Sequence, residues 1–258
     1  MLSVNEILVL SSQDSEQLRL LVTALANELP GYGVEVAILT RAPSLRRTLQ
    51  RQWKNLRYHG LLWIPYRIFV FILELIRQLI GEGHKVLTLP FPESARVRRV
   101  PSFTSQKFLK EVRAGAYQIG VVFGAPILRK ELFSIPKFGM VNVHQGITPY
   151  FRGMPPAFWE LFYNSSETGV SVHRVTEALD GGDVFLQERV AIQPSDTVES
   201  LQQRLNEITI GALPRVVKEI IEGAAHSFPV DLTLGTVYRR PKAAQIIQLA
   251  LRGKCRIS

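Results

Sequence analysis

The chain alternates short apolar runs with amphipathic segments, as α/β proteins do. Near the N-terminus, an apolar run over 6–11 is followed by Leu and Val at helical spacing over 18–29, and then by a second apolar run over 34–40. Apolar residues three and four apart predict a helix, and short continuous apolar runs predict buried strands. A strand, a helix and a second strand form a βαβ unit, so the sheet is predicted to be mostly parallel.

The rest of the chain continues this alternation. Further strands are predicted at 85–89, 119–123, 140–144, 169–175 and 184–192, and further helices at 105–114, 197–221 and 243–252. Asp196 and Glu199 are the expected capping residues of the long helix over 197–221. We therefore expect an α/β, Rossmann-like domain over 1–225, with helices on both sides of the sheet. A helical insert at about 41–84 and a short C-terminal tail over 226–258 complete this prediction.

The segment 60–80 is strongly apolar but carries charges. Four polar residues fall on one stripe of a helix: Arg67, Glu74, Arg77 and Gln78. A membrane span needs about 20 largely uncharged residues, so an amphipathic helix is predicted instead. Residues 41–57 add six basic side chains and no acidic one. Three uses remain open: packing in the core or in a homodimer, peripheral membrane contact through 41–80, or binding of an acidic small molecule.

Composition narrows the classes of partner and compartment. The 31 Lys and Arg against 22 Asp and Glu leave a net charge of +9, which favours an anionic partner. The single cysteine, Cys255, excludes a disulfide framework and fits a reducing cytoplasm. Residues 1–10 contain an acidic residue and no basic one, which argues against a signal peptide. We expect a cytoplasmic protein, with the inner face of the membrane as the alternative location.

Candidate chemistry gathers in the second half of the chain. Asn142 and His144 alternate along one predicted strand, so their side chains share a face. Asp180 follows inside Leu-Asp-Gly-Gly-Asp, where glycines permit a tight loop. Together these side chains offer an oxyanion donor, a base near neutral pH and a carboxylate, as attack on an acyl carbon requires. Each alone is more typical of a structural hydrogen-bonding residue.

Two other possibilities involve the same region. His173 could form a metal site with His144, Asp180 and Asp183, but no H-x-x-x-H or Cys spacing supports it. Residues 11–15 read Ser-Ser-Gln-Asp-Ser where a dinucleotide fold has its glycine fingerprint, which argues against NAD or FAD. We therefore expect no metal and no dinucleotide cofactor.

Four motifs carry a family resemblance: Asn142-Val143-His144, Pro149-Tyr150-Phe151-Arg152-Gly153, Glu167-Thr168-Gly169-Val170 and Leu179-Asp180-Gly181-Gly182-Asp183. In this order and spacing they resemble the folate-dependent formyltransferases, over roughly residues 115–223. That family includes the glycinamide ribonucleotide, methionyl-tRNA and nucleotide-sugar formyltransferases and the formyltetrahydrofolate deformylase. The resemblance implies a Rossmann-like domain that passes a formyl group from 10-formyltetrahydrofolate to an amine, without a metal.

The resemblance also implies roles for individual residues. Asn142, His144 and Asp180 correspond to the catalytic set of the family. Two loops would hold the folate, through Gly124, Ala125, Pro126, Ile127, Leu128, Leu179, Gly181, Gly182 and Asp183. Arg152 and Gly153 are candidates for contact with the acceptor, although a salt bridge that anchors the loop is the alternative for Arg152. Asp183 is expected to brace its glycine loop.

The identity of the amine is the least determined part of the prediction. Residues 145–149 read Gln-Gly-Ile-Thr-Pro where many members have a Ser-Leu-Leu-Pro run, and about 35 residues follow Gly223. A tail of that length leaves no room for the RNA-binding domain of the tRNA enzymes, so nucleic acid is not the expected partner. The tail resembles those of nucleotide-sugar and polysaccharide-associated formyltransferases.

We therefore expect a phosphorylated acceptor, an amino sugar on a nucleotide or lipid diphosphate. The enzymatic alternatives are formyltetrahydrofolate hydrolysis and transfer to methionyl-tRNA or glycinamide ribonucleotide. The alternative from another class is a catalytically inactive binding module at the membrane surface. The sequence leaves the sugar and the oligomeric state undetermined, with a homodimer as one possibility.

Overall fold

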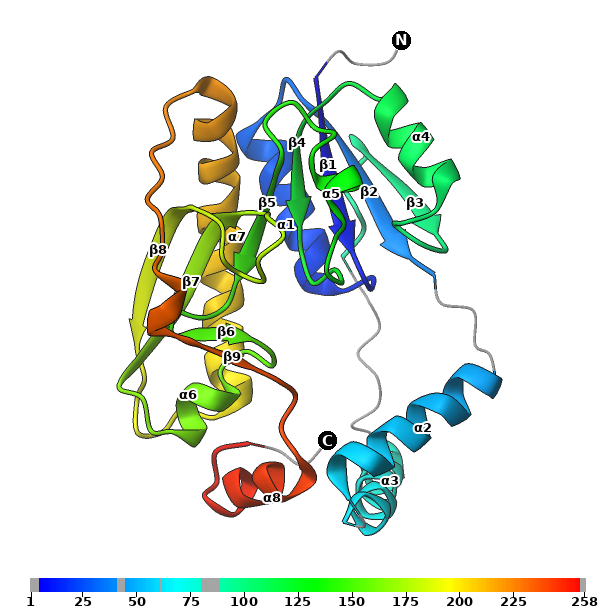
Figure 1. Ribbon diagram of the computed structural model, residues 1–258, viewed down its shortest axis with the longest axis vertical. Coiled ribbons are helices and arrows are strands. Elements are labelled where there is room, and N and C mark those ends of the chain that lie inside the picture. The colour runs from blue at the N-terminus through cyan, green and yellow to red at the C-terminus, as the bar shows by residue number, and fades with distance from the viewer. Residues whose placement is uncertain (1–4, 41–44, 61, 80–88, 256–258) are drawn as a thin grey trace.

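A seven-stranded sheet forms the centre of the molecule (Figure 1). The computed structural model describes residues 5–40, 45–60, 62–79 and 89–255. In spatial order the strands are β3 (Ala95–Val100), β2 (Gly33–Leu39), β1 (Glu6–Ser11), β4 (Tyr117–Val122), β5 (Met140–His144), β7 (Glu167–Arg174) and β8 (Val184–Ala191). The first five run parallel to their neighbours, and β7 pairs antiparallel with β5 and β8. The predicted Rossmann-like, mostly parallel sheet is confirmed.

Helices cover both faces of the sheet because its strands are apolar on both sides. Ile7 and Val9 of β1 pack with α1 (Glu16–Glu28) and α7 (Val198–Glu222). Leu8 and Leu10 point to the opposite face, where α4 (Gln106–Ala114) and α5 (Lys130–Phe133) lie. This alternation follows from the twofold period of a strand and leaves β1 buried along its whole length.

The edge strand β3 was not predicted. A strand was expected at 85–89, of which 85–88 lie outside the described residues; the edge of the described sheet is formed by Ala95–Val100, with the sequence ARVRRV. Its arginines pair with acids instead of packing in the core: Arg96 contacts Glu6 and Glu35, and Arg98 contacts Glu35 and Glu111. A search for apolar runs misses such a strand because charged side chains suit a sheet edge.

The predicted cap of the long helix α7 is wrong. Thr197 is the N-cap: its hydroxyl accepts a hydrogen bond from Ser200 N at 3.2 Å, and Thr197 N donates to the Ser200 hydroxyl at 3.0 Å. Asp196 instead binds Arg204 at 2.7 Å, and Glu199 lies in the first turn. A threonine at the N-cap and a serine three residues later can form this reciprocal capping box, in which an acidic residue is the more familiar partner.

The helical insert lies below the sheet in Figure 1, beside the C-terminal helix. It consists of α2 (Leu45–His59) and α3 (Trp63–Leu79), and α3 packs through Tyr66 and Val70 against Ala243 of α8 (Ala243–Leu251). Core packing therefore accounts for only a small part of this apolar helix. The side chains of Glu74, Arg77 and Gln78, on which the predicted polar stripe depends, lie outside the described part of the chain.

A small second sheet connects the tail to the region after β5. Its strands are β6 (Phe151–Gly153) and β9 (Thr236–Tyr238), and Arg152 pairs with Val237. The one-turn α6 (Phe158–Phe162) and the 3₁₀ turn Leu232–Leu234 complete the elements. No helix among the described residues combines the length and the hydropathy needed to cross a bilayer.

Candidate active site

The candidate site lies at the carboxyl ends of β4 and β5. The strand order changes direction beside β1, and in open α/β sheets ligands bind beyond the carboxyl ends of strands at such a point. Val122, the last residue of β4, pairs with Asn142 of β5. On the other side, Asn142 pairs with His173 of β7, and Nδ2 of Asn142 lies 3.2 Å from Nε2 of His173. The sheet itself therefore positions the Asn142 amide.

Asp180 brings the three predicted catalytic residues together. Nδ2 of Asn142 donates to Oδ1 of Asp180 at 3.4 Å, and Nδ1 of His144 lies 3.6 Å from Oδ2. Gly153 N donates to Oδ2 at 3.0 Å, which fixes the carboxylate from the side of β6. Asp180 has a positive φ of 46°, a conformation that Asp tolerates better than most residues. The loop before β8 therefore turns sharply enough to aim the carboxylate at β5.

His144 is held in one orientation by a backbone carbonyl. Its ring is buried, and Nε2 is hydrogen-bonded to the carbonyl of Phe151. Because a carbonyl can only accept, Nε2 carries the proton and Nδ1 of the neutral ring carries a lone pair that faces Asp180. Gly146 makes room for this contact, since a Cβ there would lie 2.5 Å from Nε2 and 2.7 Å from the Phe151 oxygen.

Burial and the neighbouring groups set the charges in the site. Burial lowers the pKa of His144 below its ordinary value, although the charge of Asp180 opposes this shift. Burial alone would raise the pKa of Asp180, but the nearby imidazoles of His173 and His144 and the Gly153 N–H outweigh it and lower that pKa. At neutral pH the site therefore combines a neutral imidazole with an ionised carboxylate. That combination suits a base with a partner that stabilises its protonated form.

A cavity of about 100 Å³ opens beside Asn142 and Asp180. Five of the residues expected to hold the folate line it: Ala125, Pro126, Ile127, Leu128 and Leu179. The other four serve the loops instead. Gly124 O accepts hydrogen bonds from Ser12, and Asp183 O accepts one from Arg174 N. Gly181 and Gly182 lie in close contact with other segments: a Cβ on Gly181 would lie 2.7 Å from Leu232, and a Cβ on Gly182 would lie 2.0 Å from Arg174 O.

Arg152 and Gly153, the expected acceptor contacts, have different environments. Arg152 is buried, and its Nη2 donates to Leu232 O at 3.1 Å. A backbone carbonyl therefore anchors this side chain, and not the salt bridge that was the alternative prediction. Gly153 has a φ of 96°, and a Cβ there would lie 2.2 Å from Tyr238 O. Gly153 therefore permits the close approach of β6 to β9 and the contact with Asp180.

Glu160 is a buried carboxyl that no sequence motif indicated. It lies on α6, where Oε1 accepts a hydrogen bond from the Thr168 hydroxyl at 3.0 Å. Burial raises its pKa to about 7. With His144 and Gly153 it lines a second, much smaller cavity of about 10 Å³. The only signal in the sequence is an acidic residue within the aromatic run FWELF.

The metal alternative gains no support from the geometry. Within the described part of the chain, no group of three or more His, Cys, Asp and Glu side chains could hold a metal ion. His173 lies near Asn142, and its Nδ1 is 3.0 Å from Arg174 O. Asp183 contributes its backbone carbonyl to the loop rather than joining the two histidines.

Comparison with known proteins identifies the family. Residues 93–217, just under half of the chain, match the model of the formyl transferase family. The methionyl-tRNA formyltransferase of Fusobacterium nucleatum subsp. nucleatum is 32% identical over 162 residues, which are 60% of this chain and 52% of that protein. That of Myxococcus xanthus is 38% identical over 131 residues, 48% of this chain and 42% of that protein. The chain spans about half the length of the curated relatives it matches.

Solved structures show the same fold. A sugar N-formyltransferase from Shewanella sp. FDAARGOS_354 superposes with a TM-score of 0.59 at 15% identity, over 91% of this chain and 76% of that chain. Phosphoribosylglycinamide formyltransferase from Bacillus halodurans has a TM-score of 0.59 at 18% identity, over 85% of this chain and 96% of that chain. The formyltransferase PseJ from Anoxybacillus kamchatkensis, in complex with UDP-4,6-dideoxy-4-formamido-L-AltNAc and tetrahydrofolate, gives 0.55 at 15% identity, over 96% and 93%. These likenesses confirm the Rossmann-like fold.

Proposed function

We propose that this protein transfers a formyl group from 10-formyltetrahydrofolate to a primary amine. The observation that carries the proposal is the convergence of Asn142, His144 and Asp180 beside the cavity lined by the expected folate loop. All three residues lie within the segment that matches the family. Two sides of the Asp180 carboxylate are distinct: one faces the cavity, and the other faces Gly153. Two substrates could therefore approach it from different sides. The donor would use the first approach and the amine the second.

The reaction requires a neutral amine to attack the formyl carbon. Asn142 Nδ2 would donate to the oxygen as it becomes an oxyanion, and one such donor is worth about 3 to 4 kcal/mol. The lone pair on His144 Nδ1 would accept the proton that the amine loses, and Asp180 would stabilise the imidazolium that results. The same proton then goes to the folate nitrogen as the carbon–nitrogen bond to folate breaks. Formylated amine and tetrahydrofolate are the products.

The acceptor we propose is an amino sugar carried on a nucleotide or lipid diphosphate. A cavity of about 490 Å³ lies on the Gly153 side, between Met154 and Pro155 of the site and the insert. Its polar lining includes Arg67, Arg240 and His59, which suit a diphosphate. Two structures with the same fold support this acceptor class: one is named as a sugar N-formyltransferase, and the formyltransferase PseJ holds a bound UDP-sugar.

Methionyl-tRNA is the second candidate acceptor because the curated relatives carry that name. Hydrolysis of the donor remains an alternative reaction, with water in place of the amine. We place the activity in the cytoplasm, and the free thiol of Cys255 supports a reducing compartment.

Release of tetrahydrofolate from the donor tests these possibilities. The protein would be incubated with 10-formyltetrahydrofolate alone and with UDP- and dTDP-linked amino sugars, methionyl-tRNA or glycinamide ribonucleotide. Release that depends on an amino sugar supports the proposal, release that depends on another amine changes the acceptor, and release without acceptor shows hydrolysis. No release under any condition, with donor binding demonstrated, would refute formyl transfer.

A further inference from the structure

The helix α3 leaves most of its apolar side chains uncovered. Tyr66 and Val70 pack against α8, whereas Phe71 is 63% exposed. Other large apolar side chains of the helix, outside its contact with α8, are exposed as well: Ile64, Ile68, Phe69, Ile72, Leu75, Ile76 and Leu79. Contiguous exposed apolar surface of this kind marks an interaction site in most proteins.

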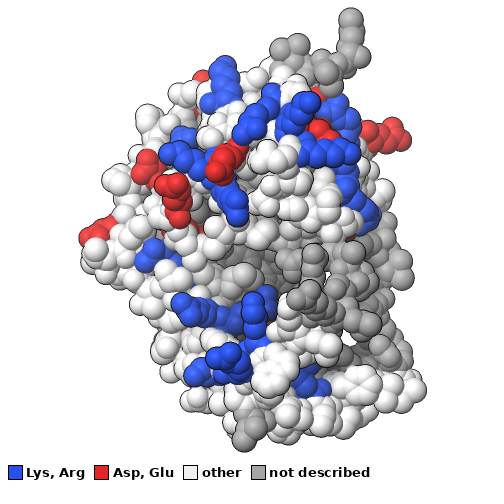
Figure 2. Space-filling model, turned by 45° about the vertical axis from the view of Figure 1, so that its right-hand side comes forward, with Lys and Arg blue, Asp and Glu red and all other residues white. Residues whose placement is uncertain are grey.

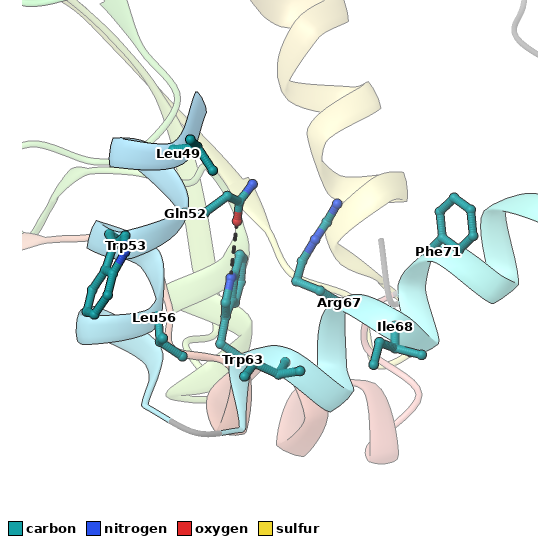
Figure 3. Close-up of a pocket in the computed structure, with 9 residues that line it drawn as sticks. Leu49, Gln52, Trp53, Leu56, Trp63, Arg67, Ile68 and Phe71 are labelled. Carbon is teal, nitrogen blue, oxygen red and sulfur yellow. Dashed lines mark hydrogen bonds between the residues drawn. The ribbon is translucent and has the colours of Figure 1, made fainter. Parts of the chain in front are cut away.

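The helix α2 extends this apolar surface. Figure 3 shows Trp53 and Leu56 of α2 across a groove from Trp63, Ile68 and Phe71 of α3. The groove has a volume of about 580 Å³, and Trp53 is 68% exposed. We call the exposed side chains of Leu49, Trp53, Ile64, Ile68 and Phe71 the hairpin face. Tryptophan suits such a position where water meets a lipid surface, because its ring is apolar and its N–H is polar.

Basic side chains are frequent on the two helices of the hairpin and in the chain just before α8. Residues 41–80 contain eight Lys and Arg and one Glu, so the insert supplies most of the net charge of +9. Exposed basic side chains of this region include Lys54, Arg57 and Arg67 of the hairpin and Arg239, Arg240 and Lys242 before α8. None of these six has an ion-pair partner among the described residues.

The two basic regions form one surface. The hydroxyl of Tyr58 donates to Arg240 O at 2.7 Å, and Ala243 N donates to His59 Nδ1 at 3.1 Å, so the chain before α8 runs along α2. In Figure 2 the lower part of the visible face shows Lys and Arg without acidic neighbours, whereas both signs mix in the upper part. The surface thus pairs exposed apolar groups with uncompensated positive charge.

We propose that the hairpin α2–α3 binds the surface of an anionic lipid bilayer. The hairpin face would enter the boundary between headgroups and acyl chains, and Lys54, Arg57 and Arg240 would contact lipid phosphates. A second copy of the chain fits less well, because a twofold contact brings the same surface onto itself and would set these unpaired cations against one another. An anionic bilayer satisfies the apolar groups and the charges together.

This orientation bears on the carrier of the acceptor. Gln52, Trp63 and Arg67 line both the apolar groove and the acceptor-side cavity that reaches Met154 and Pro155. A protein bound through the hairpin face therefore keeps that cavity close to the lipid surface, which favours a lipid diphosphate over a nucleotide as carrier. This last step rests on the proposed function, whereas binding to the bilayer does not.

Vesicle flotation with the full chain tests the proposal. The protein should float with vesicles of phosphatidylglycerol and phosphatidylcholine and stay behind with phosphatidylcholine alone. The pair Ile68→Ser and Phe71→Ser should weaken binding by about tenfold or more because it removes two inserted side chains. Leu20→Ser, at an exposed position of α1 in the sheet domain, is the matched control and should bind like the parent protein.

A charge-reversal pair separates the electrostatic part of the binding. Lys54→Glu with Arg57→Glu on α2 should also weaken binding to anionic vesicles by about tenfold or more. Added salt should weaken the vesicle binding of the parent protein. Lys107→Glu with Lys110→Glu, at the same spacing on the exposed side of α4, is the control and should change binding little. Equal loss in both charge pairs would show a general charge effect and overturn the proposed site.

Two further measurements keep the result decisive. Thermal melts must show that each variant is folded, and light scattering should show a monomer in the absence of lipid. A stable dimer that ignores anionic vesicles, and that Phe71→Ser with Ile68→Ser dissociates, would assign the hairpin face to a second copy. Failure of the folded parent protein to float would refute bilayer binding, and formyl transfer to a soluble acceptor would be judged separately.

Discussion

Gly153 N donates a hydrogen bond of 3.0 Å to Oδ2 of Asp180, across 27 positions of the chain. This bond joins the strand β6 to the loop before β8, and it fixes the carboxylate between the Asn142 amide and the His144 ring. Because β6 also pairs with β9 of the tail, the position of the carboxylate depends on segments far apart in sequence. The site is therefore assembled by the whole fold and not by one loop.

Replacing any of the three converging side chains should remove most of the activity. Asn142→Ala should lower turnover by about 10²- to 10³-fold, since it removes the proposed donor to the oxyanion. His144→Ala and Asp180→Ala should act at least as strongly by removing the proposed base and the charge proposed to stabilise it. Turnover of formyl transfer is the measurement, with melts to show that the variants fold.

An exposed histidine provides the control for this series. His226 is exposed and lies in the tail, so His226→Ala should retain the parent turnover. If His144→Ala also retained it, the base assigned to the reaction would be another group.

The titration of His144 should be displaced to lower pH. Burial lowers its pKa below the ordinary 6.5, and the charge of Asp180 opposes that shift. NMR titration of the ring should therefore give a midpoint below 6.5, and Asp180→Asn should move it lower still. A midpoint above 6.5 in the folded protein would contradict the neutral imidazole on which the mechanism depends.

Stability should follow from the same shift. A histidine with a lowered pKa in the folded state binds fewer protons there than in the unfolded state when the pH is below 6.5. Its contribution to the free energy of unfolding is therefore complete above 6.5 and decreases as the pH falls through the folded pKa. Urea unfolding of the parent and of His144→Gln across this range measures the difference.

The sequence predicted the buried parts of the fold well and the edges poorly. Strands such as Ile7 to Leu10 are apolar on both faces and are recognisable without any neighbour. The strand Ala95–Val100 is not, because Arg96 is explained by its ion pairs with Glu6 and Glu35, which lie 90 and 61 positions earlier. Long-range charge pairs of this kind cannot be read from a local pattern.

The same contrast applies to the site. Asn142 and His144 were predictable because they share a strand and a motif, and the structure places Asp180 beside them. The role of the Phe151 carbonyl could not be predicted, because every residue has a backbone oxygen and the sequence does not show which one contacts His144. Glu160 was missed because its raised pKa arises from burial, which depends on how α6 packs against β7.

Glu160 should make the protein less stable as the pH rises. Burial raises its pKa from 4.5 to about 7, so between these values the folded state binds more protons than the unfolded state. The free energy of unfolding should therefore fall as the pH increases from about 4.5 to 7, by at most on the order of 3 kcal/mol from this group.

Glu160→Gln isolates this effect because glutamine does not titrate and can still accept from the Thr168 hydroxyl. The difference in free energy of unfolding between parent and variant, measured in urea at several pH values, removes the contribution of His144. The variant should gain stability relative to the parent as the pH rises from about 4.5 to 7, and the difference should level off above pH 7. A difference that does not change with pH would show that Glu160 ionises normally in the folded protein.

Gly153→Ala should damage the site more than the fold. A Cβ at this position would lie 2.2 Å from Tyr238 O, and the φ of 96° is unfavourable for alanine. The strand β6 must then move away from β9, and the N–H that holds Asp180 moves with it. We expect formyl transfer to fall at least tenfold while the main sheet, which Gly153 does not join, remains folded.

Gly211→Ala is the control. No atom lies within 4 Å of the added Cβ, and an alanine inside the helix α7 should raise the free energy of unfolding by up to about 1 kcal/mol with turnover unchanged. Parent-like turnover in Gly153→Ala would show that the hydrogen bond from Gly153 to Asp180 is dispensable for catalysis.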